Sequence, residues 1–124
     1  MHLNKLKITE YLKKVKLREI SVEQVIKDIF HQIDRVDPKL KAYLSLNREN
    51  AFTEAIRMDN IIKEGDEIPP LAGLPVAIKD IICTMGIETT CGSKILKGFI
   101  PPYDASVIKK IKDAGAIIIG KTNM

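Results

Sequence analysis

The chain has 124 residues, of which 45% are hydrophobic and 29% are charged, and a formal net charge of +4. This balance is typical of one small globular domain and excludes a disordered or fibrous protein. The longest nearly uncharged stretch, Leu71 to Ile78, is far shorter than the roughly 20 apolar residues that span a bilayer, so no membrane segment is expected. Because no apolar h-region follows the N-terminal lysines, a secretory signal is not indicated and a cytoplasmic location is expected.

Two amphipathic helices are predicted in the first third of the chain. Apolar residues recur at helical spacing over residues 8–15, with lysines on the opposite face. Ser21 and Gln24 form the pattern of a capping box, in which each side chain binds the backbone amide of the other. The helix that begins there is expected to end at Asp37-Pro38, because proline excludes further helix.

A short strand and a third helix are predicted next. Alternating apolar residues indicate a half-buried strand: Leu40, Ala42, Leu44 and Leu46. Asn47 is the candidate N-cap of the third helix, and Gly65 is a suitable left-handed C-cap. Pro69-Pro70 then separates a helical region, residues 1–67, from a second region, residues 68–124.

The second region reads as the beginning of an α/β core. Val76–Ile78 and Ala116–Ile119 are continuous apolar runs, typical of strands buried on both faces. Asp104 is expected to cap a helix between them that ends before Gly115. Strand, helix and strand imply a right-handed crossover in a parallel or mixed sheet. Because two parallel strands leave their edges uncovered, we expect the sheet to be unfinished and the chain to be a truncated piece of a longer protein.

Lys79 is the residue best placed for chemistry. It follows an apolar strand, and active sites of open α/β sheets gather at the carboxyl ends of strands. An ammonium at such a strand must be solvated, paired or deprotonated. Asp80 offers a structural explanation, a solvent-facing Lys79–Asp80 pair, and the pattern alone favours that explanation.

The remaining polar residues form no obvious constellation. His2 and His31 lie in the helical region and are expected at the surface. Cys83 and Cys91 have no histidine nearby, so they cannot build a structural zinc site and are expected to be reduced, buried thiols. No phosphate loop, dinucleotide fingerprint or metal-ligand cluster occurs.

The serines differ in their suitability as nucleophiles. Three are expected in structural positions, as a cap, in a strand and in the first turn of a helix: Ser21, Ser45 and Ser106. Only Ser93 lies in a loop that could approach Lys79 and use it as a base. A turn-stabilising hydroxyl is the favoured role of Ser93.

Several motifs in fixed order resemble the first part of the amidase-signature core. They are the strand GLPVAIKD, the turn TTCGS, the segment PPYDA and the strand AGAIIIGKTNM, all within residues 71–124. The preceding helices are most similar to the glutaminase subunits of tRNA-dependent amidotransferases. The resemblance implies an α/β fold in which N-terminal helices precede a parallel or mixed sheet.

The resemblance also implies a role for Lys79. In that family a serine nucleophile is activated through a second serine, held by a cis peptide bond, that is hydrogen-bonded to the lysine matching Lys79. Both serines and the oxyanion hole belong to a downstream Ser- and Gly-rich stretch that this chain lacks, so residues 1–124 alone are expected to be inactive. The apolar run Val76–Ile78 is expected to bury Lys79 and so favour the neutral amine that a base requires.

Partners and cofactors follow from the same resemblance. It implies two further subunits in a heterotrimer, glutamine as substrate, tRNA bound mainly through a partner, and no cofactor in this chain, since a partner uses ATP and Mg²⁺. One alternative is a free-standing amide hydrolase of the same family. Another is a small basic RNA-binding or interaction module, suggested by the N-terminal lysines. The solvated face of an amphipathic helix explains those lysines better, because only Tyr11 is interleaved for base stacking.

Overall fold

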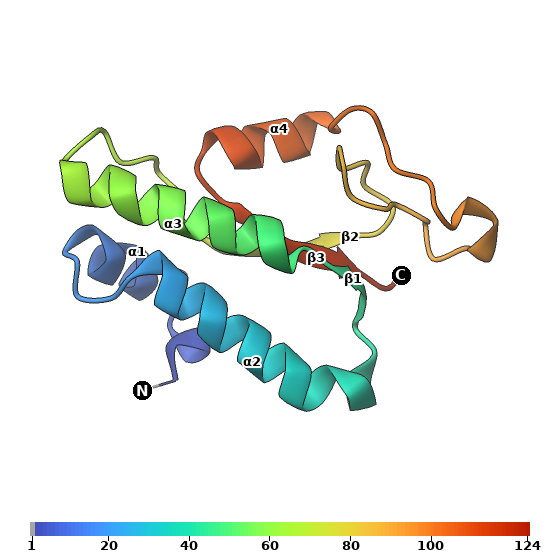
Figure 1. Cartoon of the computed structure of the whole chain (residues 1–124), viewed down its shortest axis with the longest axis horizontal. Helices are drawn as coiled ribbons and strands as arrows, with labels where there is room; N and C mark the ends of the chain where they lie inside the picture. The colour runs from blue at the N-terminus through green and yellow to red at the C-terminus, as the bar shows by residue number, and fades with distance from the viewer. Residues whose placement is uncertain (1) are drawn as a thin grey trace.

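A three-stranded mixed sheet lies between two layers of helices in the computed structural model, which describes residues 2–124 (Figure 1). The elements are α1 (Ile8–Lys16), α2 (Val22–Leu40), β1 (Tyr43–Leu46), α3 (Arg48–Glu64), β2 (Pro75–Lys79), α4 (Ser106–Asp113) and β3 (Ile117–Thr122), with 3-10 turns at Leu3–Lys5 and Lys94–Leu96. The strand order is β1-β3-β2, and β3 is antiparallel to β1 and parallel to β2. The predicted α/β class and mixed sheet are confirmed.

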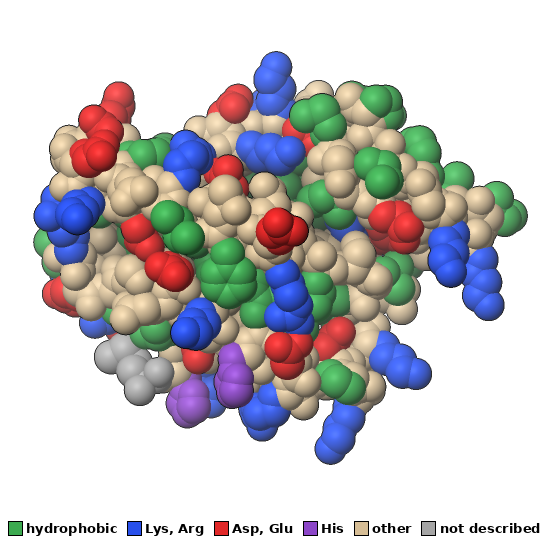
Figure 2. Space-filling view, in the orientation of Figure 1, with side chains coloured by type: hydrophobic (Ala, Val, Ile, Leu, Met, Phe, Trp, Pro, Cys, Tyr) green, Lys and Arg blue, Asp and Glu red, His purple; other side chains and the backbone are tan. Residues whose placement is uncertain are grey.

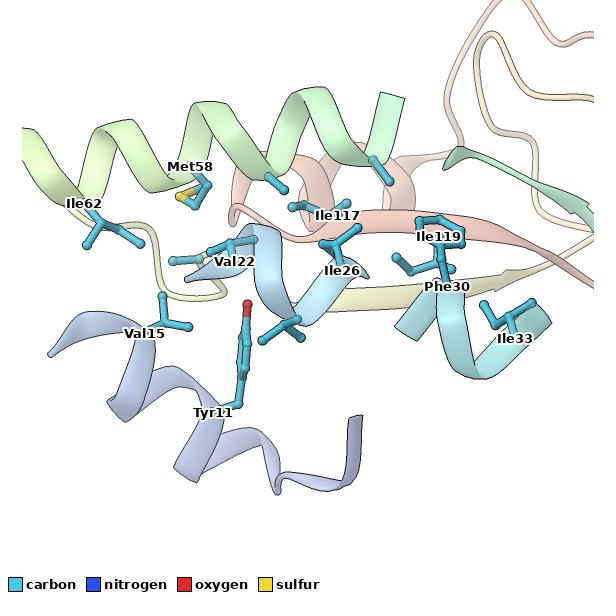
Figure 3. Packing of buried hydrophobic residues seen from close by; sticks show 14 residues of the cluster. Tyr11, Val15, Val22, Ile26, Phe30, Ile33, Met58, Ile62, Ile117 and Ile119 are labelled. Carbon is cyan, nitrogen blue, oxygen red and sulfur yellow. The ribbon is translucent and has the colours of Figure 1, made fainter. Parts of the chain in front are cut away.

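The central strand β3 contributes to two hydrophobic cores, because successive strand residues point to opposite faces. Ile117 and Ile119 pack against α1, α2 and α3 in the larger core, which Figure 3 shows from close by. On the other face, Ile118 packs with Ile78 of β2 and Ile108 of α4. Burial of β3 on both faces is therefore confirmed.

Residues from both predicted regions build this sheet. β1, from the helical region, pairs with β3, and Leu46 is opposite Gly120. The two strands approach closely there, since a Cβ atom on Gly120 would lie 2.4 Å from the Ser45 carbonyl oxygen. The boundary between residues 1–67 and 68–124 stays a prediction, and the sheet and larger core extend across it.

The capping box at α2 is confirmed, but the predicted end of this helix is wrong. The Gln24 amide donates to Ser21 Oγ (3.1 Å), and the Ser21 amide donates to Gln24 Oε1 (3.1 Å). The helix continues through Pro38 to Leu40. Proline removes one donor near the end of a helix that is already well propagated, and the helix stops at Lys41, which adopts a left-handed conformation (φ 53°).

The alternating strand predicted from Leu40 to Leu46 is also wrong in its details. Leu40 is helical and Leu44 is exposed, because a bulge between Tyr43 and Ser45 breaks the alternation. Asn47 does occupy the N-cap position of α3, but its side chain does not cap the helix.

Instead, Asn47 Nδ2 donates to the carbonyl of Ile118 (3.0 Å), which ties the start of α3 to β3. The other end of α3 is as predicted, with Gly65 in the left-handed region (φ 75°). An N-cap residue read from sequence therefore gave the helix boundary correctly but not the hydrogen bond.

Two predictions in the second region need correction. β2 is an edge strand within the described residues and Ala77 is exposed, so β2 is not buried on both faces. Asp104 does not cap α4, whose N-cap is Ala105. The Asp104 carboxylate instead accepts from the Met85 amide (2.7 Å) and pairs with Lys112 of α4 (2.9 Å), outweighing the effect of its partial burial, so its pKa is lowered.

Candidate functional site

Lys79 ends β2 at the carboxyl edge of the two parallel strands, where its partner on β3 is Thr122. Its backbone is fixed on both sides, since the Ile82 amide donates to the Lys79 carbonyl (3.0 Å) and the Asp80 amide donates to the Thr122 carbonyl (3.0 Å). The Lys79 side chain is exposed. Sequence analysis therefore placed this lysine at the correct edge of the sheet.

The predicted Lys79–Asp80 pair is wrong. Adjacent strand residues point to opposite faces, and Asp80 is buried while Lys79 is exposed. Asp80 Oδ2 accepts hydrogen bonds from the amides of Thr90 (3.1 Å) and Gly92 (3.3 Å) and from the Thr90 hydroxyl. The carboxylate thus organises the TTCGS turn.

The predicted burial of Lys79 by its own strand is wrong as well. Val76–Ile78 belongs to an edge strand in the described residues, and Lys79 extends beyond its last buried residue, Ile78. Residues 2–124 leave this lysine in contact with solvent. Any desolvation of Lys79 must therefore come from other parts of a larger protein.

A second lysine, Lys121 on β3, is the buried charge of this region, and sequence analysis did not single it out. Its side chain is 0% exposed and its Nζ lies 3.9 Å from Asp80 Oδ1. Burial lowers the pKa of Lys121, while the Asp80 carboxylate and, to a lesser extent, Cys83 and Cys91 raise it. The available signal was a lysine directly after Gly120 in a strand that is apolar and buried on both faces.

Lys121 Nζ donates three hydrogen bonds to the segment that follows Lys79. The acceptors are the Ile82 carbonyl (2.6 Å), Thr84 Oγ1 (3.1 Å) and Thr89 Oγ1 (2.8 Å). Together with Asp80, this lysine connects the end of β3 to the segment 80–92, which closes over the same edge of the sheet as Lys79.

Ser93 and the cysteines have structural environments. Ser93 Oγ accepts from the Ile95 amide (3.2 Å), which confirms its turn-stabilising role. Both thiols are free, as expected. Cys83 is half-buried and its thiol contacts the Tyr103 hydroxyl (3.6 Å), whereas Cys91 is exposed with a positive φ of 54°, so the expected burial is wrong for Cys91.

The outer surface agrees with the simpler interpretation of the N-terminal charges. Exposed lysines of this region include Lys5, Lys7, Lys13 and Lys16. His2 and His31 are exposed as predicted, and Figure 2 shows histidine side chains at the surface. Within residues 2–124, no helix has the length and apolar character needed to cross a bilayer, and no cluster of His, Cys, Asp and Glu has metal-binding geometry.

Comparison with known proteins identifies the family. Residues 24–124 match the family model described as Amidase. A curated relative, the A subunit of the glutamyl-tRNA(Gln) amidotransferase of Lachnoclostridium phytofermentans, is 50% identical across 100% of this chain. The chain belongs to the amidase family. The equivalent protein of Carboxydothermus hydrogenoformans is 48% identical over the same extent, and this amidase chain spans about a quarter of the length of both relatives (25% and 26%).

Solved structures of amidase-signature enzymes share this fold. A native peptide amidase from Stenotrophomonas maltophilia has a TM-score of 0.88 and 31% identity, and the match covers 97% of this chain and 25% of the peptide amidase. A complex connected with the origins of an s-triazine catabolic enzyme has a TM-score of 0.92 and 31% identity, covering 96% of this chain and 26% of that one. The resemblance seen in the sequence motifs is thereby confirmed.

Proposed function

We propose that this chain is the amino-terminal part of the glutaminase subunit of a glutamyl-tRNA(Gln) amidotransferase, and that Lys79 is its catalytic lysine. The observation that carries the proposal is the combination of about half-identical relatives, named as that component of the amidotransferase, with a lysine at the carboxyl edge of the parallel strands. In an α/β sheet, this edge is where reacting groups gather. The assembled protein would act in the cytoplasm.

The proposed reaction uses Lys79 as the final proton acceptor of a Ser–cis-Ser–Lys relay. Both serines would come from a part of the protein downstream of residue 124. The nucleophilic serine attacks the side-chain amide carbon of glutamine, and its proton passes through the bridging serine to the neutral Lys79 amine. The proton then returns to the leaving nitrogen, which departs as ammonia and leaves a glutamyl ester on the serine. Water hydrolyses the ester to glutamate and free enzyme.

The exposed position of Lys79 is consistent with this proposal. A neutral lysine requires removal from water, and residues 2–124 do not supply it. In the assembled protein the downstream segment that brings the serines would also cover the Lys79 side chain. Ammonia would pass to a partner that activates glutamyl-tRNA with ATP and Mg²⁺, so this chain itself would bind neither.

The proposal is tested by Lys79→Ala in the intact protein, in complex with its partner subunits. Glutamine hydrolysis and glutamine-dependent amidation of glutamyl-tRNA should both fall by at least about 100-fold, because the relay loses its proton acceptor. Amidation supplied with an ammonium salt should persist, because it uses the partner's site. Lys79→Arg should fail similarly, since a guanidinium does not release its proton near neutral pH.

Lys109→Ala, an exposed lysine on α4, is the matched control and should keep both activities. Retained glutamine-dependent activity in Lys79→Ala would remove Lys79 from the mechanism. Loss of both activities would assign it a structural role.

A free-standing amide hydrolase is the second candidate, favoured by the 31% identity to a peptide amidase. It predicts hydrolysis of a simple amide by a protein that purifies without partner subunits. Purification with two partners, and dependence of tRNA amidation on them, would support the amidotransferase.

A further inference from the structure

Lys121 is a buried ammonium that the proposed reaction does not use. It pairs across the sheet with Ile78, whereas Lys79 pairs with Thr122. Cross-strand partners share a face and neighbours along a strand alternate, so Lys121 lies on the face to which Asp80 points. The Lys79 side chain lies on the other face. The two lysines therefore meet different groups, although they stand at the same edge of the sheet.

The hydrogen bonds around Lys121 require its protonated form. Thr84 Oγ1 donates to the Ile82 carbonyl (3.1 Å), and Thr89 Oγ1 donates to the Ile87 carbonyl (3.1 Å). Each hydroxyl has one proton, so both threonines can only accept from Lys121. With the Ile82 carbonyl, these acceptors use all three N–H groups of an ammonium. A neutral amine would leave one of the buried acceptors without its donor.

The surrounding charges balance this requirement. Burial lowers the pKa of Lys121, and the nearby Asp80 carboxylate opposes that effect. Asp80 is itself 1% exposed and accepts backbone amides from the TTCGS turn. A buried charge is tolerated when it is both paired and hydrogen-bonded. Lys121 is therefore a fixed donor in a closed network and is poorly suited to act as a second base.

This network reaches the backbone of Lys79 in two steps. Lys121 Nζ holds the carbonyl of Ile82, and the amide of Ile82 donates to the Lys79 carbonyl. Lys121 also faces Asp80, whose amide bonds to β3 directly after Lys79. The backbone on the C-terminal side of Lys79 is thus held by contacts that depend on Lys121.

We propose that Lys121 is a positioning residue: its buried ammonium holds the segment 80–92 against the end of β3 and thereby fixes the orientation of Lys79. This inference rests on the proposed function of Lys79. It assigns opposite protonation states to two lysines of one strand pair, with Lys121 a permanent donor and Lys79 the exchanging base.

The first test is Lys121→Met in the intact protein, in complex with its partners, because methionine keeps the length of the side chain and removes the charge. The kcat for glutamine hydrolysis should fall on the order of 100-fold, the loss associated with misplacing a reacting group by about 1 Å. The KM for glutamine should change less than about threefold, since Lys121 does not touch substrate. Amidation with an ammonium salt should be retained, and hydrogen exchange over residues 80–92 should become faster.

The second test alters the acceptors and keeps the lysine. Thr84→Val with Thr89→Val removes two acceptors from Lys121, and a loss of kcat similar to that of Lys121→Met is expected. Thr84→Ser with Thr89→Ser keeps both hydroxyls and should restore kcat to near the wild-type value. A merely structural role for the threonine methyl groups predicts the reverse, because serine lacks the methyl and valine keeps its volume.

Each outcome decides the inference. Wild-type kcat in Lys121→Met overturns it, as does wild-type kcat in the valine pair. If Lys121→Met fails to assemble, the threonine pairs alone decide, since they keep the buried charge. Lys79→Ala is assayed in parallel: full glutaminase activity in that variant refutes the proposed function, whereas an inactive Lys79→Ala beside a fully active Lys121→Met refutes only the positioning role.

Discussion

Single hydroxyl groups hold distant parts of this chain together. The buried Tyr11 hydroxyl donates to the carbonyl of Gly73 (2.7 Å), which joins α1 to the turn before β2. Gly73 has a positive φ of 71°, and a Cβ atom there would lie 2.6 Å from the methyl groups of Val22. A tyrosine on the helical side and a glycine on the sheet side therefore form one close contact.

Tyr11 gives a prediction about pH. Burial, assisted by Asp59, raises the pKa of Tyr11 above its ordinary value of 10.0. Because the folded state favours the neutral phenol, its contribution to stability is complete below about pH 10 and is lost as the pH rises above that value. The Tyr43 pKa is raised too, by burial and by Asp37, so it adds to the same alkaline loss.

Tyr11→Phe should lower the free energy of unfolding by about 1–3 kcal/mol near neutral pH, because the Gly73 carbonyl loses its donor. It should also reduce the fall in thermal midpoint between about pH 9 and about pH 11. Thermal unfolding of the intact protein at several pH values measures both effects. An unchanged alkaline slope would show that Tyr11 does not contribute to it.

At the scale of elements, α2 and α3 stabilise each other's ends. Asp59 of α3 accepts from the free amides of Val22 (2.7 Å) and Glu23 (3.0 Å) at the start of α2. Arg18, just before α2, donates to the carbonyls of Ile62 (3.1 Å) and Lys63 (2.7 Å) at the end of α3. Each charge also has the sign that the helix dipole favours at that end. Helix ends that lack partners within their own helix are thus satisfied across the pair.

Asp59→Ala should destabilise the protein by about 2 kcal/mol or more, because two charge-assisted hydrogen bonds are lost. Ser21→Ala, which removes only the local cap, should cost about 1 kcal/mol. Asp113→Ala, at the exposed end of α4, is the control and should stay within about 0.5 kcal/mol of the wild type. Urea denaturation of the three variants ranks them. A smaller effect for Asp59→Ala than for Ser21→Ala would contradict the cross-helix cap.

At the scale of the whole molecule, apolar surface is concentrated around the segment that follows β2. Large exposed hydrophobic side chains there are Ile81, Met85, Ile95, Leu96, Phe99, Ile100 and Tyr103. Figure 2 shows hydrophobic side chains gathered at this end of the molecule. β2 is in addition an edge strand within the described residues. Uncovered apolar surface and unpaired strand edges favour association and weaken an independent fold.

A polypeptide of these 124 residues by itself is therefore expected to unfold over a broad temperature range and to release no ammonia from glutamine. It lacks the nucleophile and oxyanion donors of the proposed reaction. Calorimetry at low concentration and a coupled ammonia assay check the two parts. A sharp, cooperative transition of a monomer would contradict the first, and ammonia release that Lys79→Ala abolishes would contradict the second.

The sequence by itself determined the elements whose cause is local. The capping box of Ser21 and Gln24, the left-handed end at Gly65 and the apolar run of β3 depend on neighbours in the chain, and all are confirmed. The family motifs also identified Lys79 and the edge of the sheet where it stands, because their order along the chain is specific.

Only the tertiary structure decided where the polar side chains point. Asp80 turns away from Lys79, because strand neighbours alternate, and meets Lys121 from another strand. Asn47 and Asp104 hold long-range partners in place of the caps predicted for them. Such contacts join residues far apart in sequence, and no local pattern specifies which distant donor or acceptor a side chain will find. Local periodicity therefore predicted the strands, and their packing alone revealed the buried ammonium of Lys121.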